Sequence, residues 1–268
     1  ISFENAHGAS LAAKLDLPDG GMPRAYALFA HCFTCTKNLT AVRRVSRGLT
    51  DAMLGVLSFD FTGLGESEGE FSQTGFGSQT ADLVAAADYM VRELGHGPTI
   101  IVGHSLGGTA ALYAAREIAG VAGVATIGSP ADPEHVTKLF RGEIDEIEEL
   151  GQAEVSIGGR PFWIRNSFLE DLRRYPPEQW LGDLRTNTLV MHSPRDEVVG
   201  IDNAERIFRA VHHPRSYVSL HRADHLLSKP EDAGYVATMV GAWAREFVDA
   251  DEQGPDSAES LQSGTDAG

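Results

Sequence analysis

The chain reads PTIIVGHSLGGTAALYAA over residues 98–115, and this stretch decides the predicted fold. The apolar run at 98–102 is typical of a buried strand, and the alanine-rich residues 105–118 favour a helix. The motif Gly-x-Ser-x-Gly at 103–107 lies between them. A serine on such a sharp strand-to-helix turn is held in a strained backbone conformation that exposes its hydroxyl. The sequence therefore predicts a nucleophilic Ser105 at the end of a parallel strand.

The same alternation of strand and helix continues on both sides of this motif. Short apolar runs predict strands at 25–30, 55–59, 121–127, 188–192 and 216–220, and alternation at 10–17 predicts an antiparallel edge strand. Amphipathic helices lie between most of them, and one helical face carries Leu39, Val42, Val45, Leu49 and Met53. This order predicts an α/β domain over residues 1–248, with a mostly parallel central sheet flanked by helices.

The alternation breaks from about residue 132 to residue 185. An acidic helix is predicted at 134–150, a hairpin around Gly158-Gly159, and a mixed stretch with Pro176, Pro177 and Trp180. We interpret this segment as a lid inserted between two strands of the sheet. Its aromatic residues are candidates either to line a substrate pocket or to pack the lid onto the body: Phe140, Phe162, Trp163 and Phe168.

The composition excludes several kinds of partner. The 268 residues include 22 Lys and Arg against 38 Asp and Glu, so the net charge is −16. Such a surface repels phosphate backbones and anionic membranes, and we expect neither nucleic acid nor membrane partners. It also disfavours anionic substrates. The first residues contain no long apolar run, so no signal peptide or membrane span is predicted and a cytoplasmic location is expected.

Two further features of composition concern source and tail. Arginine supplies 18 of the 22 cations, which is typical of a GC-rich bacterial genome. Residues 249–268 contain six acidic residues and no Lys or Arg. They have too few large apolar side chains to offset the entropy of ordering, so a disordered acidic tail is predicted.

Two residues in later strand-end loops could activate Ser105. A serine hydroxyl is a weak nucleophile that needs a histidine base, and the base needs an acid to orient it. Asp196 follows the predicted strand at 188–192, and His225 follows the one at 216–220. Because the loops after parallel strands gather at one edge of a sheet, we expect Asp196 to hold the imidazole and His225 to take the serine proton.

Other acids and histidines compete for these roles. Asp132 follows the strand at 121–127, although a cap before Pro133 is the simpler interpretation. Glu197 is expected to point away from the site, and Asp224 to be a turn residue. Structural or surface roles are expected for five histidines: His104, His192, His212, His213 and His221.

Backbone amides are expected to stabilise the oxyanion of a tetrahedral intermediate, which needs two N–H donors. The first donor is the amide of Leu106, directly after the nucleophile. The second comes from the loop after the strand at 25–30, where we assign the amide of Phe33. His31 and Cys32, in the same loop, are candidates to line the pocket.

Cys32 and Cys35 are the two cysteines of the chain, too few for a disulfide framework. We expect two small buried thiols beside the pocket, and a local disulfide that gates the loop is the alternative. A zinc pair is disfavoured because a closed site needs four ligands, so no metal or organic cofactor is expected. The Gly-x-Gly at 63–65 lacks the third glycine of a dinucleotide-binding loop, and a structural loop anchored by Asp60 is expected instead.

These segments together resemble the α/β-hydrolase superfamily. They are the loop at 31–34, Asp-x-x-Gly-x-Gly-x-Ser at 60–67, Gly-His-Ser-Leu-Gly-Gly at 103–108, Asp196, and Ala-Asp-His at 223–225. More narrowly, HCFTCTK at 31–37, FDFTGLGESEG at 59–69 and DEVVGIDNA at 196–204 resemble one bacterial group, the hydrolase part of proteins fused to an OsmC-type peroxide-reducing domain. The resemblance covers about residues 1–248, and the acidic segment stands where the OsmC-type domain would follow.

The resemblance implies an α/β-hydrolase fold and an acyl-ester hydrolase with a Ser-Asp-His triad at Ser105, Asp196 and His225. Because the inserted segment has no long apolar surface suited to a lipid interface, we expect small-molecule esters with short-to-medium acyl chains. The alternatives are thioester or small-peptide hydrolysis by the same triad, and a non-catalytic binding module that uses the same pocket. The sequence does not specify an oligomeric state.

Overall fold

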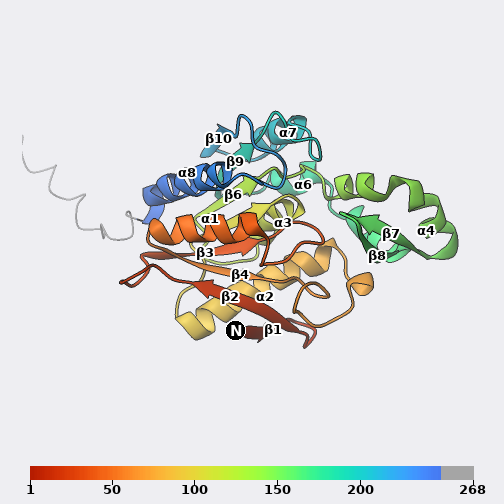
Figure 1. The fold of residues 1–268 in the computed structure, drawn as a ribbon, viewed down its shortest axis with the longest axis horizontal. Helices are drawn as coiled ribbons and strands as arrows, with labels where there is room; N and C mark the ends of the chain where they lie inside the picture. Colours follow the sequence, from red (N-terminus) through yellow and green to blue (C-terminus); the bar gives the residue numbers. More distant parts are fainter. Residues whose placement is uncertain (249–268) are drawn as a thin grey trace, which may run out of the picture.

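The computed structural model describes residues 1–248, without the side chains of residues 178 and 179, so the predicted tail lies outside the described residues. An eight-stranded sheet runs through the body in the order β1-β2-β4-β3-β5-β6-β9-β10 (Figure 1). The six strands from β4 to β10 in this order are parallel, and β1 and β2 are antiparallel. Their bounds are β1 Ser2–Glu4, β2 Ser10–Asp16, β3 Ala25–Ala30, β4 Leu54–Phe59, β5 Ile100–His104, β6 Gly123–Ile127, β9 Asn187–His192 and β10 Arg215–Ser219.

Helices cover both faces of the sheet. On one face pack α1 (Thr40–Asp51) and α8 (Pro230–Val248); on the other pack α2 (Phe76–Leu94), α3 (Leu106–Ala114) and α7 (Asp202–Ala210). Successive side chains of β3 alternate between these two cores: Ala27 and Phe29 face α1 and α8, whereas Leu28 and Ala30 face α2 and α3. Burial on both faces explains why the central strands are continuous apolar runs.

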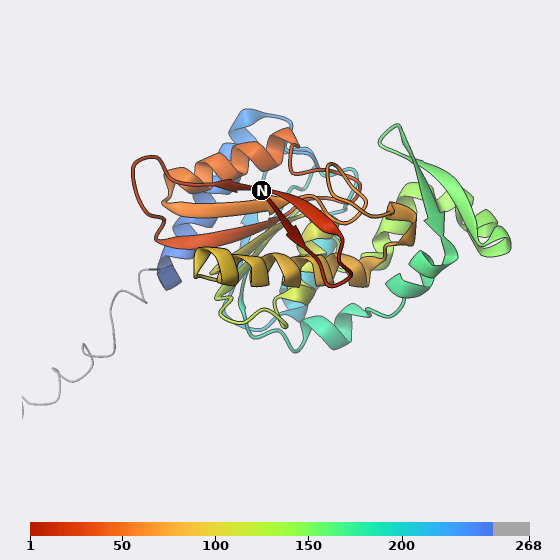
Figure 2. The same cartoon turned by 90° about the horizontal axis from the view of Figure 1, so that it is seen from below.

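Most of the segment between β6 and β9 lies at one end of the body (Figures 1 and 2). We call residues 132–185 the insertion. It contains η2 (Pro133–Glu143), α4 (Ile144–Leu150), the hairpin of β7 (Gln152–Ile157) and β8 (Arg160–Arg165), α5 (Asn166–Leu172) and α6 (Pro177–Leu181). The predicted hairpin is therefore present.

The structure corrects three predicted elements. The prediction of a single acidic helix at 134–150 is wrong. The helix is interrupted at Phe140, which has non-helical angles (φ −141°, ψ 38°) and a buried side chain. The strand at 10–17 is not the edge of the sheet, because the short strand β1 pairs with its outer side. Met53 does not belong to the helical face, because α1 ends at Asp51 and Met53 takes a positive φ of 65° in the turn into β4.

The topology brings the strand-end loops to one edge. The parallel strand β3 has β4 on one side and β5 on the other, so the chain reverses its direction of winding there. Ligands of open α/β sheets bind at such a point, beyond the carboxyl ends of the strands. The loops after β3, β5, β6, β9 and β10 all lie at this edge. Within residues 1–248, no helix has the length and apolar character needed to span a membrane.

Candidate active site

Ser105 lies on the turn between β5 and α3 with φ 54° and ψ −131°, a backbone conformation that serine rarely adopts. Glycine is required at the two flanking positions because other parts of the backbone pass too close for a side chain. A Cβ on Gly103 would lie 2.3 Å from the Cα of Gly108, and one on Gly107 would lie 2.2 Å from the carbonyl oxygen of His31. The tight turn thus presents the Ser105 side chain at the carboxyl edge of the sheet.

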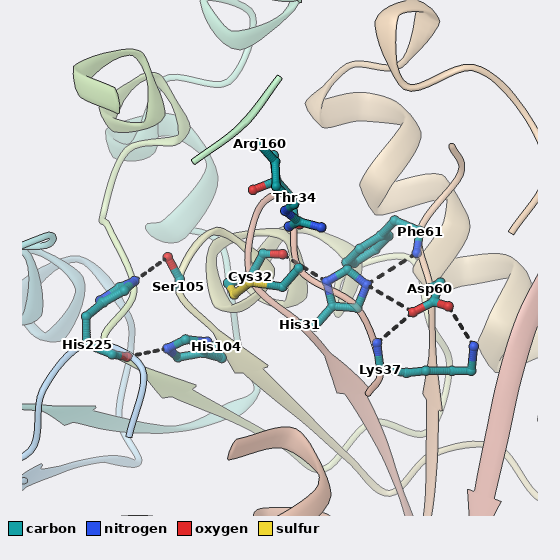
Figure 3. Close-up of a disulfide and its surroundings, with 11 residues drawn as sticks. His31, Cys32, Thr34, Lys37, Asp60, Phe61, His104, Ser105, Arg160 and His225 are labelled. Atoms are coloured by element: carbon teal, nitrogen blue, oxygen red, sulfur yellow. Dashed lines mark hydrogen bonds and ion pairs between the residues drawn. A yellow bond between two sulfur atoms is a disulfide. The ribbon is translucent and has the colours of Figure 1, made fainter. Parts of the chain in front are cut away.

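The structure brings together the three residues that the sequence singled out. The Nε2 atom of His225 is 3.1 Å from the Oγ of Ser105, and its Nδ1 is 2.8 Å from the Oδ2 of Asp196. Figure 3 shows the His225 ring directed at the Ser105 hydroxyl. Because a carboxylate only accepts hydrogen bonds, Nδ1 carries the proton and Nε2 is free to accept one from Ser105.

Asp196 is held as a carboxylate. Its Oδ1 accepts hydrogen bonds from the backbone amides of Val198 (2.9 Å) and Val199 (2.8 Å). Burial raises the pKa of this carboxyl, but hydrogen bonds from His225 and from the two amides outweigh burial and leave the pKa below its ordinary value. A charged Asp196 can orient the imidazole and stabilise its protonated form.

The rival acids lie elsewhere. The side chain of Asp132 accepts a hydrogen bond from the amide of Glu134 (2.9 Å), which is the cap expected before Pro133. Glu197 is exposed, and Asp224 accepts a hydrogen bond from the amide of Ser228 (2.8 Å).

The loop after β3 is closed by a disulfide. Cys32 and Cys35 are bonded to each other, with their Cα atoms 5.3 Å apart, so the expectation of two thiols is wrong. The amide of Cys35 also donates to the carbonyl oxygen of Cys32 (3.0 Å), and Thr34 takes a positive φ of 60°. Phe33 lies inside this small ring. Within residues 1–248, no intramolecular hydrogen bond uses the backbone amides of Phe33 or Leu106, which leaves both able to donate to a ligand.

A buried ion pair anchors the other end of this loop. The Nζ of Lys37 donates to Asp60 (2.6 Å) and to Glu66 (2.5 Å), and the backbone amide of Lys37 donates to Asp60 (2.6 Å). Burial opposes the charge on Lys37, but the two carboxylates raise its pKa. Figure 3 shows Lys37 and Asp60 on the far side of the disulfide from Ser105. Asp60 therefore holds the 60–67 loop to the 31–37 loop, as expected for a structural loop.

Two histidines beside the site are buried and neutral. The Nδ1 of His31 donates to the carbonyl oxygen of Cys32 (2.8 Å), and the Nε2 of His104 donates to that of His225 (2.7 Å). Burial lowers the pKa of each ring to about 4. His31 is 1% exposed and does not line the cavity described next, so it supports the loop from behind.

A cavity of about 300 Å³ opens above Ser105. Its wall combines Val136, Leu139 and Ile157 of the insertion with Cys32, Phe33, Leu106 and other apolar residues of the body. The aromatic residues predicted from the insertion do not form this wall: Phe140, Phe162, Trp163 and Phe168. Phe168 instead stacks on Phe33 with ring centroids 5.5 Å apart, and Trp163 is 49% exposed. A larger hollow of about 530 Å³ beside α1 is lined by charged residues and lies away from Ser105.

Two contributors to the site escaped the sequence analysis. A Cβ on Gly128 would lie 3.0 Å from the Oδ2 of Asp196, and its φ is 55°, so glycine makes room for the acid. The Nε2 of His192 donates to the carbonyl oxygen of Val199 (2.8 Å) and fixes the loop whose amides hold Asp196. The sequence signal for Gly128 was its position directly after the strand predicted at 121–127.

No cluster of three or more His, Cys, Asp or Glu side chains within residues 1–248 is arranged to hold a metal ion. The geometry described so far relies on hydrogen bonds among protein groups. It can polarise the Ser105 hydroxyl, and Phe33 and Leu106, whose amides are unpaired among the described residues, line the same cavity as Ser105.

Comparison with known proteins places the chain in a family. Residues 28–255 match the family model of the alpha/beta hydrolase fold, and the chain belongs to this family. Among solved structures, an esterase domain from Rhodothermus marinus is 48% identical, with a TM-score of 0.76 and coverage of 92% of this chain and 98% of that one. No curated protein sequence matches the chain.

More distant structures share the fold. Est1E from Butyrivibrio proteoclasticus, determined with bound ferulic acid, is 19% identical with a TM-score of 0.71, covering 94% of this chain and 99% of that one. Alpha/beta hydrolase domain-containing protein 10 from mouse is 19% identical with a TM-score of 0.74, covering 92% and 98%. The family and the esterase relative support hydrolase activity on a small molecule.

Proposed function

We propose that this protein is a serine carboxylesterase that cleaves short-to-medium acyl esters through an acyl-enzyme. The observation that carries the proposal is the hydrogen-bonded series Ser105–His225–Asp196, which ends in an apolar cavity beside two unpaired backbone amides. The 48% identical esterase domain from Rhodothermus marinus supports the choice of an ester.

Each group has a defined part in the proposed reaction. Ser105 Oγ attacks the ester carbonyl carbon while its proton passes to the Nε2 of His225. Asp196, accepting from Nδ1, stabilises the imidazolium that forms. The amides of Phe33 and Leu106 donate to the carbonyl oxygen as it becomes an oxyanion. His225 then protonates the leaving alcohol, and a water molecule, activated by the same histidine, releases the acid from Ser105.

The cavity supports small substrates. At about 300 Å³ it lies at the lower end of the range for small-molecule sites, and its wall is mostly apolar. We assign residues 1–248 to one catalytic domain in which the insertion acts as a lid. Val136, Leu139 and Ile157 of the insertion complete the cavity wall, and a movement of the insertion would open it.

Source and location are part of the same proposal. The resemblance of three segments to the hydrolase part of OsmC-type fusion proteins supports a bacterial origin, and sequencing downstream of the gene would test the relation.

We propose a cytoplasmic location on the basis of composition. The Cys32–Cys35 disulfide weighs against it, because structural disulfides persist mainly in oxidising compartments. Cell fractionation decides between the two.

Hydrolysis of 4-nitrophenyl esters from acetate to decanoate tests the function. We expect the wild type to prefer acyl chains of two to eight carbons, and Ser105→Ala to lose activity by about a thousandfold or more. Circular dichroism of the variant controls for folding. Equal activity of the two proteins would exclude the mechanism.

Two further arms address the alternatives. A thioester and an anilide with the preferred acyl group rank thioesterase and peptidase activity against esterase activity. A fluorophosphonate probe reacts covalently with an activated serine, so failure to label Ser105 would favour a non-catalytic binding module.

A further inference from the structure

The charged side chains that line the cavity have one sign. Besides His135 and His225, the charged residues in its wall are Lys138 of η2 and Arg160 of β8, and no Asp or Glu among the described residues lines it. The chain as a whole has 38 acidic residues against 22 basic ones. The charge on the cavity wall is therefore opposite in sign to the net charge of the molecule.

Neither cation is neutralised by the protein. Among the side chains that the structure describes, no carboxylate lies within salt-bridge distance of the Lys138 ammonium or the Arg160 guanidinium. Lys138 is exposed, and its ammonium group makes no hydrogen bond to the described part of the chain. The neighbouring His135 is neutral at pH 7, because burial lowers its pKa, and its Nε2 donates to the carbonyl oxygen of Val198.

Arg160 is held in place over the loop after β3. Its Nη2 donates to the carbonyl oxygen of Thr34, as Figure 3 shows, and its guanidinium lies 5.4 Å from the ring centre of Phe162. One of its five N–H groups is used in this way, and the others have no partner among the described residues. The geometry thus presents a fixed, planar set of donors at the rim of a cavity whose floor is Ser105.

We propose that Lys138 and Arg160 select esters that carry a carboxylate, a few carbon atoms from the ester group. The inference rests on the proposed esterase function and names its substrate class. The apolar wall would contact the hydrocarbon part of the substrate, while the two cations at the rim bind the carboxylate. A guanidinium and an ammonium are the protein groups best suited to this anion.

Two matched pairs of substrates test the proposal. For a carboxylate on the acyl side, mono-4-nitrophenyl adipate is compared with 4-nitrophenyl hexanoate. For one on the alcohol side, 4-(butyryloxy)benzoate is compared with its methyl ester. The kcat/KM of each is divided by its rate of alkaline hydrolysis, which removes differences in intrinsic reactivity. We expect a preference of fivefold or more for the carboxylated member of at least one pair.

The variants then assign the preference to these two side chains. In Lys138→Gln/Arg160→Gln the preference should be lost, mainly through a higher KM for the carboxylated ester. Lys138→Gln alone should lose part of the preference for the carboxylated ester. This variant removes no side-chain hydrogen bond of the described protein, so loss of a protein hydrogen bond would not explain the result. Lys138→Arg/Arg160→Lys should retain the preference. Rising salt should weaken it, because exposed charges are screened.

A control of equal charge change is available. Arg92 and Arg245 lie in the last turns of α2 and α8, at the opposite end of the sheet from the site. Arg92→Gln/Arg245→Gln should keep the wild-type preference. The proposal is overturned if the wild type prefers neither carboxylated ester, or if Lys138→Gln and the Lys138/Arg160 double variant both keep the full preference. Failure of the wild type to hydrolyse 4-nitrophenyl hexanoate would instead refute the esterase function itself.

Discussion

His104 donates a hydrogen bond from Nε2 to the backbone carbonyl oxygen of His225 at 2.7 Å, so the residue before Ser105 holds the loop of the proposed base. The two residues are 121 positions apart in the sequence. Their rings lie 5.1 Å apart, and burial together with the nearby His225 keeps His104 neutral. The variable position of the Gly-x-Ser-x-Gly motif therefore holds the loop that carries His225, the proposed base.

We expect His104→Leu to lower kcat about tenfold or more with little change in KM, because the His225 carbonyl loses its donor and the imidazole loses its fixed orientation. His104→Gln can place an amide nitrogen near the former Nε2 and should recover most of kcat. Steady-state kinetics on 4-nitrophenyl butyrate measure both. Wild-type kcat in the leucine variant would contradict the positioning role.

Stability should fall as the pH drops below 6.5. His31 and His104 have folded pKa values of about 4, below the ordinary value of 6.5, so the unfolded chain binds protons first as the pH falls. The contribution of these two neutral histidines to the unfolding free energy is complete above pH 6.5 and is lost as the pH approaches 4. Between pH 7 and pH 5 each should cost about 2 kcal/mol of unfolding free energy.

Urea unfolding at the two pH values measures this loss. His104→Gln should remove about half of the contribution of these two residues to the pH dependence. An unchanged pH dependence in the variant would show that His104 does not titrate as described.

Asp196→Asn should reduce kcat by about 10³- to 10⁴-fold, since an amide favours the wrong tautomer of His225 and cannot stabilise imidazolium. Asp132→Asn is the matched control. An asparagine still caps the helix start, so its kcat should stay within about twofold and its stability within about 0.5 kcal/mol. A larger loss of kcat in Asp132→Asn than in Asp196→Asn would assign the role of the acid to Asp132, in the loop after β6.

Removal of the Cys32–Cys35 disulfide should reduce both stability and rate. Opening a ring this small costs about 2 kcal/mol, or a melting temperature lower by about 4–8 °C. The rate should fall less than tenfold, because the Cys35–Cys32 backbone hydrogen bond and the Lys37–Asp60 ion pair still hold the loop. Melting curves and kinetics with and without dithiothreitol measure these effects. Cys32→Ser/Cys35→Ser should be insensitive to the reductant, and equal sensitivity would exclude the disulfide as its target.

Gly107→Ala should destabilise the protein by about 3 kcal/mol or more, because the added methyl group would overlap the carbonyl oxygen of His31. Gly142 offers the control: a Cβ there meets nothing within 4 Å, so Gly142→Ala should change stability by less than about 1 kcal/mol. Thermal unfolding compares the two. Similar melting temperatures would show that the turn can open at small cost.

Much of the fold could be predicted because its signals are local. Each buried parallel strand is a short apolar run, and the predicted strand at 188–192 differs from the observed β9 by one residue. The errors lie where tertiary contacts override local preference. Phe140 interrupts a helical pattern because its side chain is buried, and β1 consists of three residues that pair with β2.

The sequence by itself determined the alternation of strands and helices, the glycine-bounded turn at Ser105, and the order Ser105, Asp196, His225. These depend on neighbours a few positions apart. Only the tertiary structure decided which insertion residues face the cavity, that His104 holds His225, and that Arg160 reaches Thr34. Those contacts join residues more than 100 positions apart, and they depend on how the insertion packs against the sheet edge. No periodicity along the chain specifies that packing.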